Sequence, residues 1–162
     1  MKGYSILILT IGIPGAGKTT WVKEYTSHHH AVHVISTDEI RKELTGTKDC
    51  NPAESCKIHE EARRRVKDII DNPEKYGHVA PVGPEIIVDS TNVELSEWQK
   101  YRSLGPTLMY AKIFNVPPPI AMANQLSGRK DRIVPLEILE MKWKQLQESL
   151  QFIPTIFNFI IS

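Results

Sequence analysis

Apolar runs alternate with amphipathic segments along most of this chain. The apolar runs are rich in β-branched and aliphatic residues, which is typical of strands covered on both faces of a parallel sheet. They cover residues 4–11, 32–35, 85–89 and 107–114. Segments with helical periodicity lie between and after them, at about 19–25, 38–44, 52–70, 95–104, 117–126 and 135–150. The alternation predicts an α/β fold, with a parallel sheet of four strands flanked by helices and joined by right-handed crossovers.

Local signals mark where several helices begin and end. Thr37 or Asp38 can cap the helix after the second strand, and Pro52 suits the first turn of the next helix. Gly105 closes the helix before the fourth strand. Residues 72–84 end in a segment rich in proline and glycine, so we predict a loop there.

The tail at residues 152–160 is strongly apolar. It is too short to span a bilayer, so we expect no membrane association. An exposed segment of this kind would aggregate. We therefore expect the tail to add a fifth strand to the sheet or to contact a second copy of the chain in a homo-oligomer.

Composition narrows the class of protein. A chain of 162 residues with 41% hydrophobic and 24% charged residues fits one globular domain over residues 1–162. The net charge of +1 excludes binding to nucleic acid by bulk electrostatics, so any such contact needs a local basic groove. The only two cysteines, Cys50 and Cys56, provide no disulfide framework and favour a reducing, cytoplasmic location.

A complete phosphate-binding motif, G-x-x-x-x-G-K-[ST], follows the first strand and precedes a helix. Its residues are Gly12, Ile13, Pro14, Gly15, Ala16, Gly17, Lys18 and Thr19, and Thr20 continues the predicted nucleotide site. Backbone N–H groups of such a loop cradle a polyphosphate at a helix N-terminus. We expect Lys18 to reach the β- and γ-phosphates and the Thr19 hydroxyl to bind Mg²⁺. The motif predicts a nucleoside triphosphate as cofactor.

Two carboxylates follow neighbouring strands, where ligands gather in open parallel sheets. Asp89 ends the third strand and is the expected second metal residue, although it can instead cap the loop that holds Asn92. Asp38 follows the second strand and is placed to accept the proton of an attacking hydroxyl. Arg41 shares its helix face, three residues on, and can bind an anion on the acceptor. The alternative for Asp38 and Arg41 is an ordinary ion pair.

A basic turn at residues 127–132 precedes the last helix. Arg129 and Arg132 lie in it. Folded over the triphosphate as a lid, the turn would place a guanidinium against the transferring phosphoryl group. If the turn only packs against solvent, its substitution should change nothing.

Other polar groups have less specific interpretations. Three adjacent histidines, at residues 28–30, point in different directions on a helix end and favour a solvated end over a metal site. His59 with the two cysteines matches no standard zinc spacing. The basic face of the helix at 52–70, including Arg63 and Arg64, is typical of a solvated surface.

Four pieces of the chain, in order, resemble the 5′-kinase domain of bacteriophage-type polynucleotide kinase, within the P-loop kinase superfamily. They are residues 12–21, Asp38-x-x-Arg41, residues 89–92, and Arg129 ahead of Val134 and Pro135. The resemblance implies transfer of the γ-phosphate of ATP to the 5′-hydroxyl end of DNA or RNA. Lys18 would bind phosphates, Asp38 would be the general base, and Thr19 would serve Mg²⁺. Arg41 would hold the phosphate 3′ to the acceptor nucleoside, and Arg129 would stabilise the transferring group.

Two positions depart from that family. Thr37 stands where an arginine is expected before the base, and Ser90 separates Asp89 from Thr91. The family's 3′-phosphatase signature, D-x-D-x-T, is absent, so we expect kinase activity alone. Two other functions remain open: a kinase of a small metabolite, an antibiotic or an aminoacyl-tRNA, and a non-catalytic nucleotide switch. Asp38 and Arg41 discriminate among the three, because a switch needs neither residue.

Overall fold

One parallel sheet runs through the molecule, whose computed structural model describes residues 3–49, 51–128 and 132–162. Within these residues it has five strands in the order β2-β3-β1-β4-β5, and all the pairings are parallel. The strands are β1 (Tyr4–Ile11), β2 (Val32–Ser36), β3 (Val82–Asp89), β4 (Leu108–Ile113) and β5 (Phe159–Ile160). The predicted α/β class is confirmed, and the sheet has the fifth strand.

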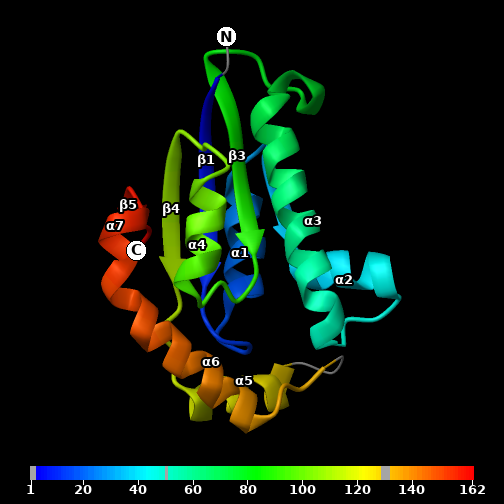
Figure 1. Cartoon of the computed structure of the whole chain (residues 1–162), viewed down its shortest axis with the longest axis vertical. Helices are drawn as coiled ribbons and strands as arrows, with labels where there is room; N and C mark the ends of the chain where they lie inside the picture. Colours follow the sequence, from blue (N-terminus) through cyan, green and yellow to red (C-terminus); the bar gives the residue numbers. More distant parts are fainter. Residues whose placement is uncertain (1–2, 50, 129–131) are drawn as a thin grey trace.

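Helices cover both faces of the sheet and its carboxyl end. They are α1 (Lys18–His28), α2 (Thr37–Thr45), α3 (Pro52–Asp71), α4 (Leu95–Arg102), α5 (Pro118–Gly128), α6 (Leu136–Ser149) and α7 (Ile153–Ile156), with 3₁₀ segments at η1 (Pro73–Tyr76) and η2 (Leu150–Phe152). Figure 1 shows α3 and α4 in front of the sheet and α1 behind it, while α5 and α6 lie beyond the strand ends. None of the described helices is both long and apolar enough to cross a bilayer.

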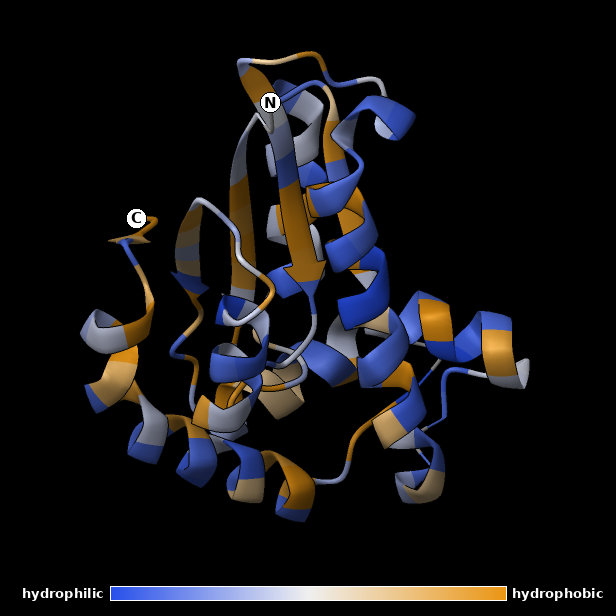
Figure 2. Cartoon of the chain, turned by 45° about the horizontal axis from the view of Figure 1, so that its top comes forward, coloured by the Kyte–Doolittle hydropathy of each residue, from blue (hydrophilic) through white to orange (hydrophobic). Residues whose placement is uncertain are grey.

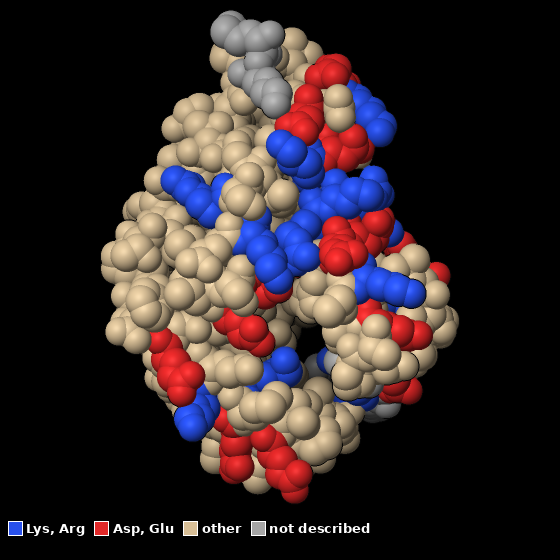
Figure 3. Space-filling model, viewed as in Figure 1, with Lys and Arg blue, Asp and Glu red and all other residues tan. Residues whose placement is uncertain are grey.

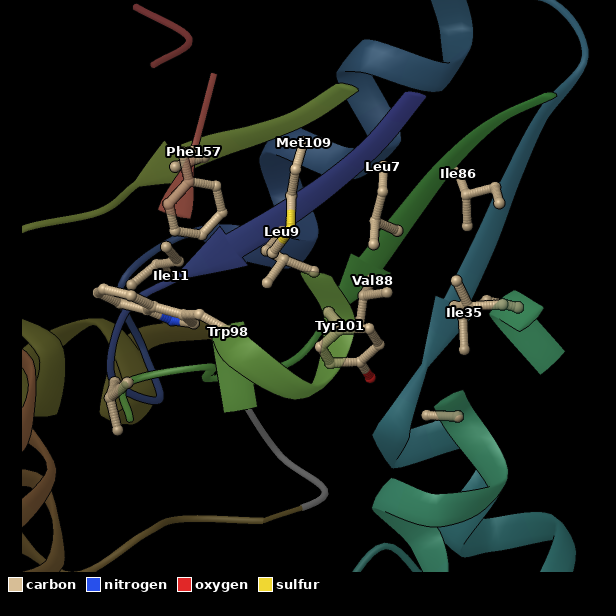
Figure 4. Close-up of a cluster of buried hydrophobic side chains, with 14 of the residues drawn as sticks. Leu7, Leu9, Ile11, Ile35, Ile86, Val88, Trp98, Tyr101, Met109 and Phe157 are labelled. Atoms are coloured by element: carbon tan, nitrogen blue, oxygen red, sulfur yellow. The ribbon is translucent and has the colours of Figure 1, made fainter. Parts of the chain in front are cut away.

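The core lies mainly between the sheet and the α3–α4 layer. Alternate residues of each strand face this layer, so Leu7, Leu9 and Val88 are fully buried there. Figure 4 shows them with Trp98 and Tyr101 of α4. A smaller cluster faces α1, and both faces are therefore apolar, as in other parallel sheets. Figure 2 shows the contrast between these hydrophobic strands and the largely hydrophilic helices.

Helix α2 is capped by a residue that the sequence analysis did not select. The Ser36 hydroxyl accepts a hydrogen bond from the Glu39 N–H at 3.3 Å, so neither Thr37 nor Asp38 is the cap. Ser36 also pairs in register with Asp89. The ends of β2 and β3 therefore lie side by side.

The predicted loop at residues 72–84 is shorter than expected. Segment η1 occupies its start, and β3 begins at Val82 rather than at residue 85. A side chain at Gly83 would place its Cβ 1.9 Å from the Tyr4 carbonyl oxygen, so glycine permits the close approach of β1. The register shifts between Tyr4 and Ile6, which accommodates this approach.

The apolar tail divides into a helical turn and a strand. Helix α7 starts it, and Phe157 then packs edge-on against Trp98 with ring centroids 5.3 Å apart. Strand β5 pairs with β4, where the Asn158 N–H donates to the Met109 carbonyl at 2.8 Å. The expectation of an added strand is correct for β5. The contact with a second copy stays a prediction.

Candidate active site

Glycines shape the loop between β1 and α1. Gly15 and Gly17 have φ angles of 85° and 95°, in the left-handed region that glycine adopts at little cost. Gly12 has no room for a side chain, because a Cβ there would lie 2.9 Å from the Phe114 carbonyl oxygen. The loop has the local geometry that its motif requires, at the carboxyl end of the central strand β1.

Lys18, the first residue of α1, folds back onto this loop. Its Nζ donates to the Ile13 carbonyl at 2.7 Å, and the residue is only 9% exposed. The positive charge is therefore held at the loop, largely out of water, where charge interactions are stronger than in bulk solvent. This position suits the predicted contact with the terminal phosphates.

The two predicted metal residues are in contact. The Thr19 hydroxyl donates to Asp89 Oδ2 at 3.1 Å, which joins the first turn of α1 to the end of β3. Both offer hard oxygen atoms, the donors that Mg²⁺ prefers, and the donor set fits this ion. The described residues contain no group of three or more His, Cys, Asp or Glu side chains that could hold a metal. That finding is compatible with Mg²⁺, which in phosphoryl-transfer sites takes most of its ligands from water and substrate phosphates.

Asp38 and Arg41 form a close ion pair on α2. Arg41 Nη1 lies 2.7 Å from Asp38 Oδ1. The Arg41 side chain is 6% exposed, whereas that of Asp38 is 34% exposed. The ion pair considered in the sequence analysis therefore exists. It orients a carboxylate that an incoming hydroxyl can still reach.

A second arginine approaches the same carboxylate. Arg132 Nη2 lies 3.6 Å from Asp38 Oδ1, and its Nη1 donates to the Lys48 carbonyl at 2.7 Å. These contacts tie the segment before α6 to the loop between α2 and α3. Nothing local to residue 132 indicates contact with α2, so the sequence places Arg132 in the basic turn without a separate role. Arg129, the predicted lid residue, lies outside the described residues.

The two departures from the phage family touch one another. The Thr37 hydroxyl donates to Ser90 Oγ at 3.0 Å, and both residues are buried. Thr10 of β1 donates to the Ser90 carbonyl at 3.0 Å, and Asn92 Nδ2 donates to the Thr10 carbonyl at 2.9 Å. This buried network joins the ends of β1 and β3 to the start of α2. It fixes the start of α2, which carries Asp38, and the end of β3, which carries Asp89.

Asn92 offers a stability test of that network. Its φ is 46°, which alanine tolerates poorly and glycine tolerates well. We expect Asn92→Ala to lower the free energy of unfolding by about 2 to 3 kcal/mol, from the lost hydrogen bond and the strained φ. Asn92→Gly should lose about 1 kcal/mol less, because only the hydrogen bond is lost. Urea unfolding measures both, and equal losses would contradict the strain assignment.

The remaining polar candidates do not converge. His28 Nδ1 lies 3.0 Å from the Glu24 carbonyl, while His29 stacks on Tyr25 with ring centroids 3.8 Å apart. They belong to separate local contacts on α1, as expected for a helix end. Cys56 is an exposed free thiol, and Cys50 lies outside the described residues.

Several solved structures share this architecture. A chain of the Pnkp1/Rnl/Hen1 RNA repair complex matches with a TM-score of 0.74 and 17% identity, over 93% of this chain and 47% of that one. This chain thus spans about half of that relative. A gluconokinase from Sinorhizobium meliloti 1021 gives a TM-score of 0.58 at 15% identity, over 92% and 77% of the two chains. A deoxyadenosine kinase from M. mycoides gives a TM-score of 0.52 at 15% identity, over 96% of this chain and 90% of that one. At these identities the likeness establishes the P-loop kinase fold.

A family model described as an AAA domain matches residues 7–153. This range contains the phosphate loop, the Asp38–Arg41 pair and Asp89. Because the match covers most of the sequence, the chain belongs to the AAA domain family designated AAA_33.

Proposed function

We propose that this protein is an ATP-dependent polynucleotide 5′-hydroxyl kinase. The observation that carries the proposal is the Asp38–Arg41 pair, with a partly exposed carboxylate held on a buried guanidinium. The pair follows β2, whose last residue is in register with Asp89, and Asp89 contacts the first turn of α1 after the phosphate loop. These contacts support an acceptor side at the ends of β2 and β3, next to the phosphate-binding loop.

The reaction needs a base for the acceptor and a cradle for the donor. The 5′-hydroxyl oxygen would attack the γ-phosphorus, and its proton would pass to Asp38 as the bond to the β,γ-bridging oxygen breaks and ADP leaves. Lys18 and the loop N–H groups would bind the β- and γ-phosphates. Thr19 and Asp89 would hold Mg²⁺, which neutralises charge on the phosphates when bound. Arg129 is proposed, by resemblance, to stabilise the transferring group.

Arg41 is the residue that would recognise a nucleotide end. One of its terminal nitrogens donates to Asp38, and its Nε is buried without a hydrogen-bond partner among the described residues. A buried donor without an acceptor costs free energy that an incoming oxyanion can recover. A phosphate attached 3′ to the acceptor nucleoside supplies such an oxyanion. The likeness to a chain of an RNA repair complex supports this choice of acceptor.

A kinase of a small metabolite is the second candidate. The likeness to a gluconokinase over 92% of this chain favours it, since the same scaffold carries a different acceptor there. Such an enzyme would keep a base at Asp38 and would have no use for recognition of a 3′-phosphate by Arg41.

Transfer of labelled γ-phosphate distinguishes the two candidates. We expect a 5′-hydroxyl oligonucleotide and a nucleoside 3′-monophosphate to be labelled, and the free nucleoside to be labelled poorly. Arg41→Gln should lower kcat/KM for the first two by about 10- to 100-fold more than for the nucleoside, the value of one charge-assisted contact, because any effect on the orientation of Asp38 is common to all three acceptors. Equal labelling of nucleoside and nucleotide by the unaltered protein would contradict the role of Arg41. Labelling of sugars alone would support the metabolite kinase.

Two further proposals accompany this function. A contact with a second copy through the tail is compatible with Phe159 and Ile160, which are 58% and 50% exposed. Sedimentation of the full chain and of Phe159→Ser tests that contact. The cytoplasmic location stays a prediction from cysteine usage.

A further inference from the structure

A cluster of charged residues that have no role in the proposed reaction acts electrostatically on the imidazole of His59. His59 and Arg63 come from α3, and Lys142 comes from α6. Glu97 of α4 lies 3.1 Å from Arg63 Nη1 and 4.0 Å from His59 Nδ1. Helices α3 and α4 thus bring these polar side chains together.

The charges in this cluster are coupled to the acceptor pair. Burial lowers the pKa of His59 below its usual 6.5, Glu97 opposes that shift, and Arg63, Arg41 and Lys142 add to it. All four charged groups are therefore within electrostatic reach of one imidazole. Arg41 belongs to α2, so the cluster is electrostatically linked to the Asp38–Arg41 pair.

Positive charge is in excess here. Glu97 is shared by Arg63 and by Lys100, whose Nζ lies 3.3 Å from its other oxygen. Lys142 has no ion pair among the described residues. His59 Nδ1 is buried without a hydrogen-bond partner in the described part of the chain. The carboxylate of Glu97 therefore balances only part of the positive charge of Arg63, Lys100 and Lys142. A bound anion would balance the remainder.

The cluster is accessible from outside. The side chains of His59, Arg63 and Glu97 are 27%, 17% and 17% exposed. Figure 3 shows a hollow on this face of the molecule, with both basic and acidic side chains around it. Partial burial strengthens the cations relative to fully solvated ones, and their remaining exposure leaves them accessible to a ligand.

We propose that His59, Arg63 and Lys142 bind the second phosphate of a polynucleotide acceptor, the one that follows the phosphate held by Arg41. This inference rests on the proposed function and makes it more specific. The acceptor strand would enter the site with one phosphate on Arg41 and the next between α3 and α6. A substrate with two phosphates would then bind more tightly than one with a single phosphate.

Steady-state kinetics with two acceptors test this subsite. One acceptor is a nucleoside 3′-monophosphate, and the other is a 5′-hydroxyl dinucleotide that carries a 3′-phosphate. We expect KM to be about tenfold lower for the dinucleotide, the value of one additional charge-assisted contact. Lys142→Gln and Arg63→Gln should each remove most of that difference and leave KM for the mononucleotide unchanged. The slope of log KM against log salt for the dinucleotide should fall by about 0.7 in each variant.

Arg64→Gln is the matched control. Arg64 is the next residue on α3, is 64% exposed, and pairs with Glu61 on the outer surface. It should alter neither KM. Lys142→Gln complements Arg63→Gln because its loss removes no ion-pair partner from Glu97.

The outcomes separate this inference from the proposed function. Equal KM values for the two acceptors in the unaltered protein would overturn the subsite and leave the kinase intact. A variant that raises both KM values equally would show that the cluster acts through the fold, which also overturns the subsite. If neither acceptor is labelled, the proposed function itself fails and the subsite fails with it.

Proton linkage at His59 gives a further check. A bound phosphate should raise the pKa of His59 from its lowered value, so the complex holds more protons than the free protein. The preference for the dinucleotide should therefore increase as the pH falls through the range below about 6.5. His59→Gln should flatten this dependence and keep the preference itself at higher pH. The same pH profile in both proteins would remove His59 from the subsite.

Discussion

Replacing Asp38 with asparagine is expected to lower kcat by about 10²- to 10⁴-fold, the range for removal of a general base. Asparagine keeps the size and the oxygen of the side chain but cannot accept the proton of the attacking hydroxyl. The phosphate loop, Lys18 and Thr19 are untouched, so affinity for ATP should persist. Single-turnover transfer to an oligonucleotide and equilibrium binding of a fluorescent ATP analogue measure the two effects separately.

The same substitution leaves a buried cation without its carboxylate. Arg41 is 6% exposed, and its ion-pair partner is Asp38, so the variant will be less stable. Thermal unfolding must therefore accompany the kinetics, and the assay temperature must lie well below the midpoint. Glu39→Gln is the control, because Glu39 is the adjacent carboxylate, is 58% exposed and pairs with Lys48. Full activity in Asp38→Asn, or an equal loss in Glu39→Gln, would remove Asp38 as the base.

Contiguous patterns in the sequence predicted most of the fold. The apolar runs of β1 and β3 are buried on both faces, so their composition alone indicates central parallel strands. The phosphate loop is equally local, since φ angles above 80° at Gly15 and Gly17 require residues that the motif itself specifies. The order of the strands was not predicted, because it depends on which crossovers pack together.

Contacts between distant segments were not predictable from one sequence. Thr37 and Ser90 were identified as departures from a family, yet nothing local indicates that their hydroxyls bond to one another. Arg132 likewise reaches Asp38 and Lys48 across more than 80 residues of chain. The start of β3 was missed because proline and glycine usually mark loops, whereas Gly83 here permits two strands to approach.

The acceptor site also depends on the ion pair between Asp38 and Arg41, whose role the i, i+3 spacing alone does not decide. An i, i+3 carboxylate and guanidinium are compatible with a solvated ion pair or with a preorganised base. Burial favours the preorganised base, since the Arg41 side chain is buried whereas the Asp38 side chain is partly exposed. An arginine held in this way loses little conformational entropy when an anion binds, which favours recognition over surface solubility. The basic face of α3 shows the same division: Arg64 is solvated, whereas Arg63 turns toward α4.

Loss of Lys18 should be distinguishable from loss of any acceptor residue. Lys18→Met should lower kcat/KM by about 10²- to 10³-fold, the usual cost of removing one donor that stabilises charge in the transition state. Because Lys18 lies on the loop that holds the donor phosphates, the decrease should be the same for the oligonucleotide, the mononucleotide and the free nucleoside. Arg41 and Arg63 variants, by contrast, should discriminate among these acceptors.

Methionine is the informative replacement because Lys18 is only 9% exposed and its stem is already packed. An apolar chain of similar length fills that space, so the folded state should survive, although loss of the hydrogen bond to the Ile13 carbonyl should cost about 1 to 3 kcal/mol. Lys23→Met, an exposed position on the same helix, controls for the loss of one charge. A decrease in kcat/KM that differs among the acceptors would show that Lys18 acts on the acceptor. It would contradict the assignment of Lys18 to the donor phosphates.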